Sequence, residues 1–282
     1  MRRLLAFFAK RYIAGIEIKN AIEAARRLNS LGILATIDNL GENVSDIHKA
    51  KLSVREYHRL LEEIDKAKVK STVSLKLTHL GLDISEDLAR ANAESILRKA
   101  MQYGNSVCLD MEGSGYTKRT IDICLSLRKD YPNVSIAIQS YLKRSAADIT
   151  LLNKNSISVR LVKGAYKEPP EIAFADKKDV DANYEALMKE LLLHGNRPAI
   201  ATHDERLINE AIRFANDNAI GKESFEFQML LGIKRGLQKR LADESFKMRV
   251  YVPYGAEWLP YTLRRFRERK ENIYFVLKNI FD

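Results

Sequence analysis

Eight short runs of β-branched and apolar residues recur along the chain, and a longer amphipathic segment follows each of them. The runs cover residues 33–38, 72–77, 106–111, 134–139, 158–163, 199–203, 225–230 and 248–252. The distance between successive starts ranges from 23 residues, between 225 and 248, to 41 residues, between 158 and 199. Such spacing is typical of βαβ units, which take roughly 30 residues and build a parallel sheet covered by helices. Eight units predict an α/β fold of the (βα)8, or TIM-like, type, and a doubly wound open sheet is the alternative.

The segments between the runs carry helix-start signals. Ser85, followed by two acidic residues, predicts an N-cap for a helix over 88–101, and Asp204 with Glu205 does the same for 207–216. No shift in composition and no Gly/Ser/Pro-rich linker divides the chain. We therefore expect a single domain over 1–282, with one or two leading helices over 1–30 and the barrel over 31–282.

Composition excludes several protein classes. Hydrophobic residues make up 46% of the chain and charged residues 30%, which is typical of a globular protein. The apolar run at 4–9 is far shorter than the roughly 20 residues that span a bilayer, and we expect it to form an amphipathic first helix. The two cysteines, Cys108 and Cys124, provide neither a disulfide framework nor metal-ligand spacing, which favours a reducing cytoplasm. The formal charge of +10 fits nucleic acid, anionic membranes or anionic small ligands equally well.

Polar side chains gather near the predicted carboxyl ends of the strands, where barrel enzymes place their chemistry. They are Asp38, Lys76, Thr78, Asp110, Glu112, Gln139, Arg160, Lys163, Thr202, His203, Glu226, Gln228, Arg249 and Tyr251. Each residue alone is best explained as part of a satisfied ion pair under the rim. Isolated buried charges are costly, so their convergence from seven or eight strands predicts a site for a polar ligand. An anion or polar cofactor over the fifth strand would account for Arg160 and Lys163.

Other site types are less well supported. The chain has no GxGxxG fingerprint and no GxxxxGK[ST] loop, so neither a Rossmann site nor a P-loop is expected. His203, Asp204 and Glu205 resemble metal ligands, but none of the other histidines stands at a helix or strand spacing from His203. We expect no metal.

The segment 261–269 places Tyr261, Arg264, Arg265 and Glu268 on one helical face. Two guanidiniums side by side match the two oxygens of a carboxylate, and Glu268 can orient them. The alternative, which this segment alone favours, is a solvated basic helix with i,i+4 pairs.

Seven motifs occur together and in order: SLKLT around Lys76, LDME, RLVKGAY, ATHD, FEFQMLLGI, RVYVPYG and RRFRER. The set closely resembles the proline dehydrogenase family, in its monofunctional bacterial type, from about Ile33 onward. The resemblance implies a distorted (βα)8 barrel with its last helix over the barrel mouth and FAD bound non-covalently. It also implies oxidation of L-proline to Δ1-pyrroline-5-carboxylate, the first step of proline catabolism to glutamate, with hydride passing from proline C5 to flavin N5 and electrons then passing to a membrane quinone.

The resemblance also implies roles for individual residues. Lys76, Arg264 and Arg265 would bind the substrate carboxylate, with Glu268 supporting the arginine pair. Asp110 would stand beside Lys76, and Arg160 would lie near flavin N5; these two are the candidate catalytic residues. The pocket walls would be Tyr166, Leu230 and Tyr251. The FAD contacts would be Gln139, Val162, Lys163, Gly164, Ala165, Thr202, His203 and the backbone near Met111, with Lys177 at the phosphates and Phe275 beside the dinucleotide.

The resemblance further implies proline rather than 4-hydroxyproline as the substrate, because members of this family with a tyrosine at the position of Tyr251 act on proline. The implied acceptor is lipid-soluble, which together with the basic surface favours a cytoplasmic protein with a weak peripheral contact at the inner face of the cell membrane. No nucleic acid is expected as a partner. Two alternatives stay open: another flavin or phosphate-ligand barrel enzyme, and a basic, non-catalytic module that binds nucleic acid or anionic surfaces.

Overall fold

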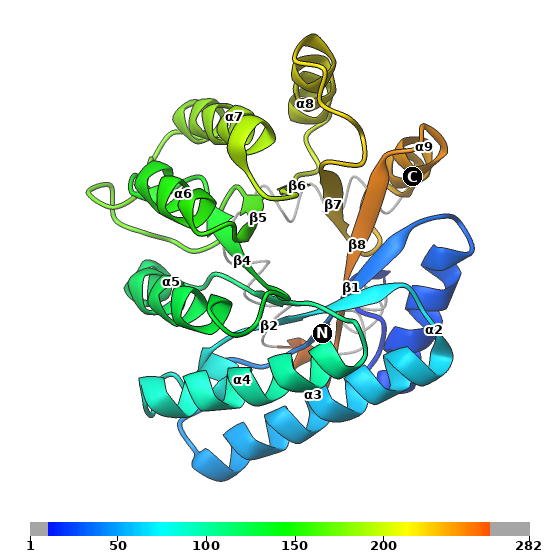
Figure 1. Cartoon of the computed structure of the whole chain (residues 1–282), viewed down its shortest axis with the longest axis vertical. Coiled ribbons are helices and arrows are strands. Elements are labelled where there is room, and N and C mark those ends of the chain that lie inside the picture. The colour runs from blue at the N-terminus through cyan, green and yellow to red at the C-terminus, as the bar shows by residue number, and fades with distance from the viewer. Residues whose placement is uncertain (1–10, 260–282) are drawn as a thin grey trace.

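Eight parallel strands form a closed barrel in the computed structural model, which describes residues 11–259 (Figure 1). The strands are β1 Leu34–Asn39, β2 Ser71–Leu75, β3 Val107–Leu109, β4 Val134–Gln139, β5 Ser158–Val162, β6 Ala199–Ala201, β7 Glu226–Leu230 and β8 Lys247–Tyr254. Each strand pairs with its neighbours in sequence, and β8 pairs with β1 from Leu34 opposite Arg249 to Asn39 opposite Tyr254. The predicted barrel is confirmed, and the closing pair excludes an open sheet.

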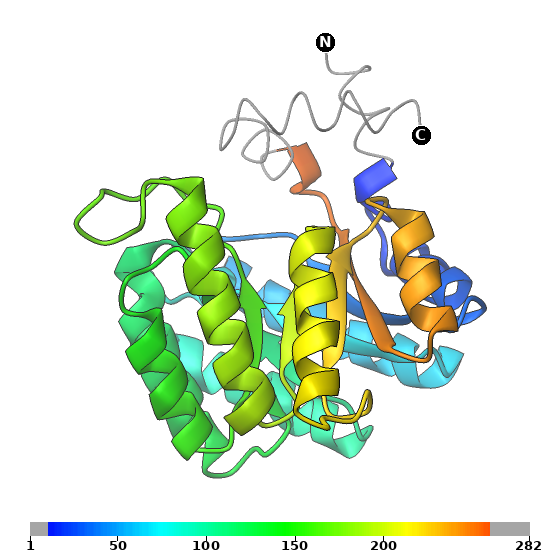
Figure 2. The same ribbon diagram turned by 90° about the horizontal axis from the view of Figure 1, so that it is seen from above.

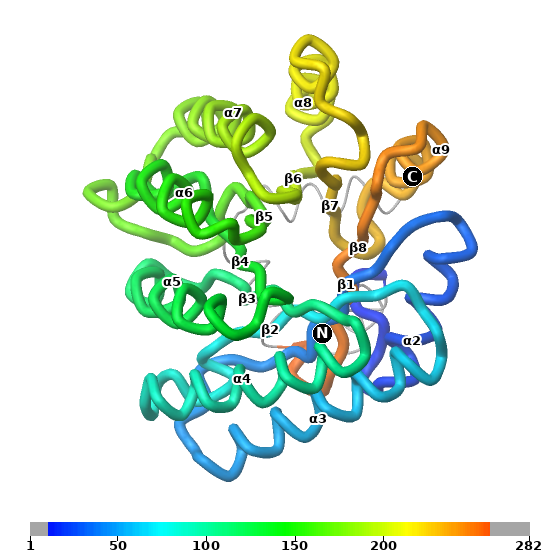
Figure 3. Tube along the Cα trace, viewed as in Figure 1, coloured from blue at the N-terminus to red at the C-terminus, as the bar shows by residue number. Residues whose placement is uncertain are grey.

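Helices surround the barrel and stand alongside its strands (Figure 2). They are α2 Ile18–Asn29, α3 Ile47–Ala67, α4 Glu86–Gln102, α5 Ser114–Arg128, α6 Ser145–Lys154, α7 Lys177–His194, α8 Glu205–Asp217 and α9 Arg235–Asp243. The helices α3 to α9 follow β1 to β7 in order, whereas α2 precedes β1. Because α2 packs against β8, β1 and α3, it takes the eighth place in the ring, between α9 and α3 (Figure 3). The predicted last helix over the mouth lies outside the described residues.

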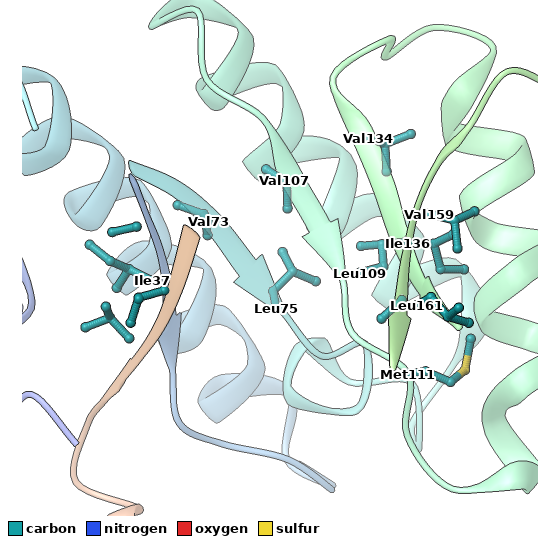
Figure 4. Packing of buried hydrophobic residues seen from close by; sticks show 14 of the residues in the cluster. Ile37, Val73, Leu75, Val107, Leu109, Met111, Val134, Ile136, Val159 and Leu161 are labelled. Carbon is teal, nitrogen blue, oxygen red and sulfur yellow. The ribbon is translucent and has the colours of Figure 1, made fainter. Parts of the chain in front are cut away.

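The core lies between the strands and the helices. Alternate strand residues, such as Ile37, Leu75 and Leu161, point outward and are fully buried (Figure 4). Burying one such side chain stabilises the fold by about 1.5–3 kcal/mol, so this layer dominates the stability of the barrel.

The helix starts agree with the sequence signals: Ser85 Oγ accepts from Leu88 N at 3.4 Å, and a carboxylate oxygen of Asp204 accepts from Arg206 N at 3.1 Å.

The inner face of the barrel is polar. Barrel interiors are usually filled by bulky branched aliphatic side chains. Here the inward positions carry alcohols, a thiol, acids, bases and amides: Thr36, Asp38, Ser74, Cys108, Gln139, Arg160, Glu226, Gln228, Arg249 and Tyr251. The charged side chains in such a lumen must be paired. Polar groups that can take part in binding or catalysis therefore line the interior of the barrel as well as its mouth.

The observed strands differ from the predicted ones at several ends. The runs 72–77, 106–111 and 199–203 were expected to be strands throughout, yet β2, β3 and β6 end two residues earlier, at Leu75, Leu109 and Ala201. After β2 the chain turns into a short 3-10 helix, η1 Thr78–Leu80, which stops the ladder. The polar residues of these runs therefore follow the strands on loops. No helix within residues 11–259 has the length and apolar character needed to cross a membrane.

Candidate active site in a polar barrel

Lys76 is the central cation at the carboxyl end of the barrel. Its Nζ lies 3.0 Å from Asp38 Oδ2 and 3.9 Å from Asp110 Oδ2, and its side chain is only 7% exposed. Burial by itself would lower the pKa of Lys76, but the two carboxylates outweigh burial and raise the pKa above its ordinary value. Lys76 therefore keeps its charge near neutral pH, and it can hold an anion but cannot act as a base.

Asp110 lies between two cations, Lys76 and Arg160. Its Oδ1 is paired with the guanidinium of Arg160, and its Oδ2 accepts a hydrogen bond from Tyr251 Oη at 2.6 Å. Arg160 also donates to Ser74 Oγ at 2.8 Å, and its guanidinium carbon lies 5.5 Å from the centre of the Tyr251 ring. Burial raises the pKa of Asp110 above its ordinary value, although Arg160 and Lys76 oppose the rise. This carboxyl group is therefore closer to accepting a proton than an exposed aspartate would be.

The motif after β5 requires its glycine. Gly164 has φ +119°, and a Cβ there would lie 2.2 Å from Cδ1 of Tyr141. The backbone at this point is tied to the end of β4, because Ser140 N donates to Val162 O at 2.8 Å and Tyr141 N donates to Lys163 O at 2.9 Å. Only glycine allows the chain to pass this close to the ring, and residues Val162 to Ala165 are partly exposed along the rim.

Lys163 and Lys177 both form ion pairs with nearby aspartates. Lys163 Nζ lies 2.6 Å from Asp181 Oδ1 on α7 and 3.0 Å from Asp204 Oδ2 at the start of α8. Its side chain thus ties β5 to two helices, whereas Arg160 turns into the lumen, so the two cations do not face one ligand as expected from the sequence. Lys177 Nζ lies 2.6 Å from Asp181 Oδ2 but remains 65% exposed at the first turn of α7. The N-cap of α7, Asp176, makes no side-chain capping bond, so backbone donors remain there for an anion.

Four further rim residues are Gln139, Thr202 and Met111, which are buried, and His203, which is half-buried. Gln139 ends β4, and its Oε1 has no hydrogen-bond partner among residues 11–259. His203 Nε2 accepts from Leu230 N at 2.9 Å, so the neutral ring carries its proton on Nδ1; burial, helped by Lys234 and Lys163, lowers the pKa of His203 to about 4. Thr202 Oγ1 accepts from Asp204 N at 3.1 Å. The side chain of Met111 belongs to the outer core, which leaves only its backbone near the mouth.

The loop between β5 and α7 is held by an acid that the sequence did not reveal as part of the site. Glu168 Oε1 accepts from Ser114 N at 2.7 Å, and its Oε2 accepts from Ser114 Oγ at 2.5 Å. Gly113, the N-cap of α5, has no side chain to cap that helix, and Glu168 does so from another loop. This contact fixes the loop that carries Tyr166, which is half-buried and close enough to Lys76 to influence its pKa. The sequence offered one signal for this contact: glycine at position 113 cannot cap the helix that follows it, so another residue must.

A cavity of about 470 Å³ borders Lys76 and His79. The loop over residues 40–46, between β1 and α3, forms most of its wall, and Glu257 also lines it. Its volume falls within the range of small-molecule sites. Leu230 and Tyr251, predicted as pocket walls, are partly buried near the end of β7 and in β8. Arg264, Arg265, Glu268 and Phe275 lie outside the described residues.

Two residues expected at the mouth are found at the other end of the barrel. Glu226 is the first residue of β7, and Arg249 is the third residue of β8. Arg249 Nε lies 2.7 Å from Glu226 Oε1, and Nη2 lies 3.0 Å from Oε2, so the two form a bidentate pair near the amino-terminal end of the lumen. Within residues 11–259, no three His, Cys, Asp or Glu side chains gather to hold a metal ion.

Comparison with known proteins gives consistent matches over nearly the whole chain. The family model described as proline dehydrogenase matches residues 21–278. Proline dehydrogenase 1 of Bacillus subtilis (strain 168) is 41% identical over 272 residues, which cover 96% of this chain and 90% of the relative. Proline dehydrogenase of Deinococcus radiodurans is 40% identical over 277 residues, with 96% and 89% covered.

A solved structure supports the same relationship. Proline utilization A from Bdellovibrio bacteriovorus, inactivated by N-propargylglycine, matches with a TM-score of 0.86 and 27% identity. The match covers 92% of this chain but 32% of the other, so this chain spans about a third of that longer protein.

Proposed function

The chain belongs to the proline dehydrogenase family and is therefore an oxidoreductase that acts on proline, and we propose that it oxidises L-proline to Δ1-pyrroline-5-carboxylate with FAD as a non-covalent cofactor. FAD, when bound, would accept at N5 the hydride that leaves C5 of proline. The observation that carries this proposal is the hydrogen-bonded cluster of Lys76, Asp110, Arg160 and Tyr251, in which Lys76 also lines a cavity of small-molecule size. FAD supplies the two-electron acceptor, and the protein supplies binding and orientation.

The rim residues fit such a cofactor. Gln139 offers an unpaired buried acceptor, and the ring of His203 offers an Nδ1–H donor. The partly exposed turn over Val162 to Ala165 would contact the cofactor along the rim. The uncapped start of α7 and the exposed ammonium of Lys177 suit a pyrophosphate. Val162, Lys163, Ala165, Thr202 and the backbone of Met111 complete the proposed contacts, and Phe275 would flank the dinucleotide.

Orientation of the substrate depends on its carboxylate. Lys76 keeps its charge and would bind one carboxylate oxygen, and Arg264 and Arg265, supported by Glu268, would bind from the other side. Binding the carboxylate would fix C5 of the proline ring against the flavin. Such positioning lowers the activation barrier by several kcal/mol. Tyr166, Leu230 and Tyr251 would enclose the ring, and the bulk and hydroxyl of Tyr251 would select against 4-hydroxyproline.

Arg160 would act by charge. It is buried, its guanidinium is paired with Asp110, and nearby acids keep it protonated. A fixed cation beside the cofactor stabilises the negative charge that develops when hydride arrives. The substrate amine must be neutral to release hydride, so the rate should rise with pH as that amine loses its proton. We further propose that the electrons pass to a membrane quinone and that the basic surface gives a weak peripheral contact with the inner face of the cell membrane.

Anaerobic addition of L-proline to the purified, FAD-loaded protein tests the function. The yellow absorbance should bleach with saturable dependence on proline, and air or a quinone should restore it. N-propargylglycine, which inactivates the Bdellovibrio protein, should block bleaching after incubation. Protein that shows no flavin absorbance and gains none with FAD would favour a different ligand for the strand-end cations. DNA binding that weakens steeply with salt, without proline-dependent dye reduction, would favour the nucleic-acid alternative.

A further inference from the structure

Three neighbouring strand ends carry the charged groups around Lys76. Lys76 directly follows β2, Asp110 directly follows β3, and Asp38 is the second-last residue of β1. The ladder between β2 and β3 stops at this point: Leu75 is registered opposite Leu109, and Asp110 N donates to Leu75 O at 2.8 Å (Figure 4). Backbone pairing therefore does not extend to Lys76, and it does not by itself fix where the ammonium lies relative to Asp110.

A contact of the Glu112 side chain takes over two residues further along both segments. Thr78 N donates to Glu112 Oε1 at 3.2 Å, and Thr78 Oγ1 donates to Glu112 Oε2. Both residues are buried. Hydrogen bonds to a carboxylate are stronger than those between neutral groups. Lys76 and Asp110 thus lie between the last ladder bond and this double contact, which connects the two segments on the far side of the charged pair.

Thr78 also holds the segment that follows β1. Asn43 N donates to Thr78 Oγ1 at 2.9 Å, and Val44 N donates to Thr78 O at 3.0 Å. Because the hydroxyl accepts from Asn43, its single proton is available for Glu112, so both contacts are made at once. One threonine therefore joins the segments that follow β1, β2 and β3.

Lys76 belongs to the same turn as Thr78. His79 N donates to Lys76 O at 3.2 Å, so the backbone of Lys76 is part of the tight turn that leads into η1. The ammonium lies on a flexible four-carbon stem, and its direction depends on Asp38 at 3.0 Å and Asp110 at 3.9 Å. A shift of this turn would change both distances, because the two aspartates belong to other strands.

We propose that Thr78 is a positioning residue for substrate binding: together with Glu112 it holds the ends of β1, β2 and β3 so that Lys76 meets the substrate carboxylate in the correct geometry. The proposal rests on the proposed function, in which Lys76 binds the carboxylate of proline. Thr78 acts through Lys76 and does not need to touch the substrate. Glu112 acts by fixing the turn, and not by its charge.

The charge of Glu112 gives the proposal a sign that can be tested. Glu112 is attracted by Lys76 and repelled by Asp110. Glu112→Gln removes a negative charge near Lys76, so electrostatics alone would strengthen the binding of an anion. The same change leaves one acceptor for two donors, Thr78 N and Thr78 Oγ1, and so disrupts the contact. Charge and position therefore predict opposite changes in the affinity for proline.

Three variants separate these effects. Thr78→Val keeps the branched shape of the side chain but removes both hydroxyl contacts, whereas Thr78→Ser keeps the hydroxyl. Glu112→Gln tests the sign. The control is Thr120→Val, the same substitution at a fully buried residue of α5 whose hydroxyl has no partner among residues 11–259.

Each FAD-loaded protein is reduced with L-proline in anaerobic stopped flow, which gives the dissociation constant for proline and the limiting rate of bleaching separately. Hydrogen exchange over residues 40–46, followed by mass spectrometry, reports whether the segment after β1 is still held, and it does not depend on catalysis.

In Thr78→Val the dissociation constant for proline should rise about tenfold, while the limiting rate stays within about threefold of the parent. Exchange over 40–46 should become faster. Thr78→Ser and Thr120→Val should both remain within about twofold of the parent in the dissociation constant. Glu112→Gln should weaken proline binding at least roughly threefold, and this variant decides if Thr78→Val does not fold.

The proposal would be overturned by an unchanged dissociation constant or unchanged exchange in Thr78→Val, or by tighter proline binding in Glu112→Gln. A limiting rate that falls more than the affinity in Thr78→Val would also overturn it, because the effect would then lie in the reaction and not in binding. A parent protein that proline does not bleach would instead reject the proposed function, and the role of Thr78 in proline binding with it.

Discussion

Replacing Asp38 with Asn is expected to lower the free energy of unfolding by about 3 kcal/mol. The Asp38 side chain is fully buried, and its Oδ2 lies 3.0 Å from Lys76 Nζ. Removing one charge of a buried pair typically costs 3–5 kcal/mol because the partner is left uncompensated. Asp110 Oδ2 remains 3.9 Å from the same ammonium and compensates part of its charge, which places the expected loss near the lower bound.

The assay is urea unfolding at pH 7 with a fixed excess of FAD, because bound ligand contributes to apparent stability. The matched control is Asp65→Asn, which removes an exposed ion pair of 2.8 Å with Lys68 and should cost no more than about 1 kcal/mol. The Michaelis constant for proline should fall in the Asp38 variant, because Lys76 would be shared with one carboxylate fewer. A loss no larger than that of the control would refute the view that Asp38 compensates a buried charge.

Four further expectations are testable. Gly164→Ala should release FAD and lower the melting temperature, because a Cβ there would lie 2.2 Å from the ring of Tyr141. The control is Gly104→Ala, where φ is +62° but no atom lies within 4 Å, so only backbone strain of about 1–2 kcal/mol is expected. Tyr251→Ser should raise the activity ratio of 4-hydroxyproline to proline in steady-state assays, and an unmoved ratio would remove the specificity argument. Arg264→Met should raise the Michaelis constant for proline strongly while FAD stays bound in absorbance spectra. The pKa of His203 is lowered to about 4 in the folded protein, so the unfolded chain binds the proton more tightly. The free energy of unfolding should therefore fall as the pH drops from about 6.5 to 4. His203→Gln should make this fall with pH less steep in urea unfolding.

The layout of the barrel could be predicted because its outer layer repeats a simple pattern. Residues such as Val73, Leu109 and Val159 alternate with polar ones, and a β-branched or aliphatic outer face is what a helix-covered strand requires. Capping residues at Ser85 and Asp204 then marked two helix starts. The position of α2 was not predictable in the same way. Its amphipathic pattern indicates that one face is buried, but not that this face covers β8 and β1.

The depth of a side chain in the lumen also could not be predicted from the sequence. Alternation assigns Glu226 and Arg249 to the inner face, but their height depends on the register between strands, with Gln228 opposite Arg249. That register follows from the stagger of the whole barrel, which no single run encodes. The direction of Lys163 was uncertain for a related reason. It follows the last residue of β5, where alternation no longer applies, and Asp181 on α7 and Asp204 at the N-cap of α8 hold it away from the lumen.

Charge balance inside the barrel limits what the described residues can bind. Three cations and three carboxylates pair in the lumen, as Lys76 with Asp38, Arg160 with Asp110, and Arg249 with Glu226. These pairs cancel, so a substrate carboxylate that enters beside Lys76 brings a negative charge that no surplus cation of the lumen offsets. An uncompensated buried charge costs several kcal/mol.

The missing positive charge must therefore come from outside the lumen. The adjacent arginines at 264 and 265 are one such source, ten residues after β8 ends at Tyr254. If they supply it, then replacing Lys76 with Met should weaken proline binding less in an Arg264→Met background than in the parent, because both cations act on one anion and their effects are not additive. Strictly additive losses in a proline titration of the four proteins would mean that the two residues act on different groups.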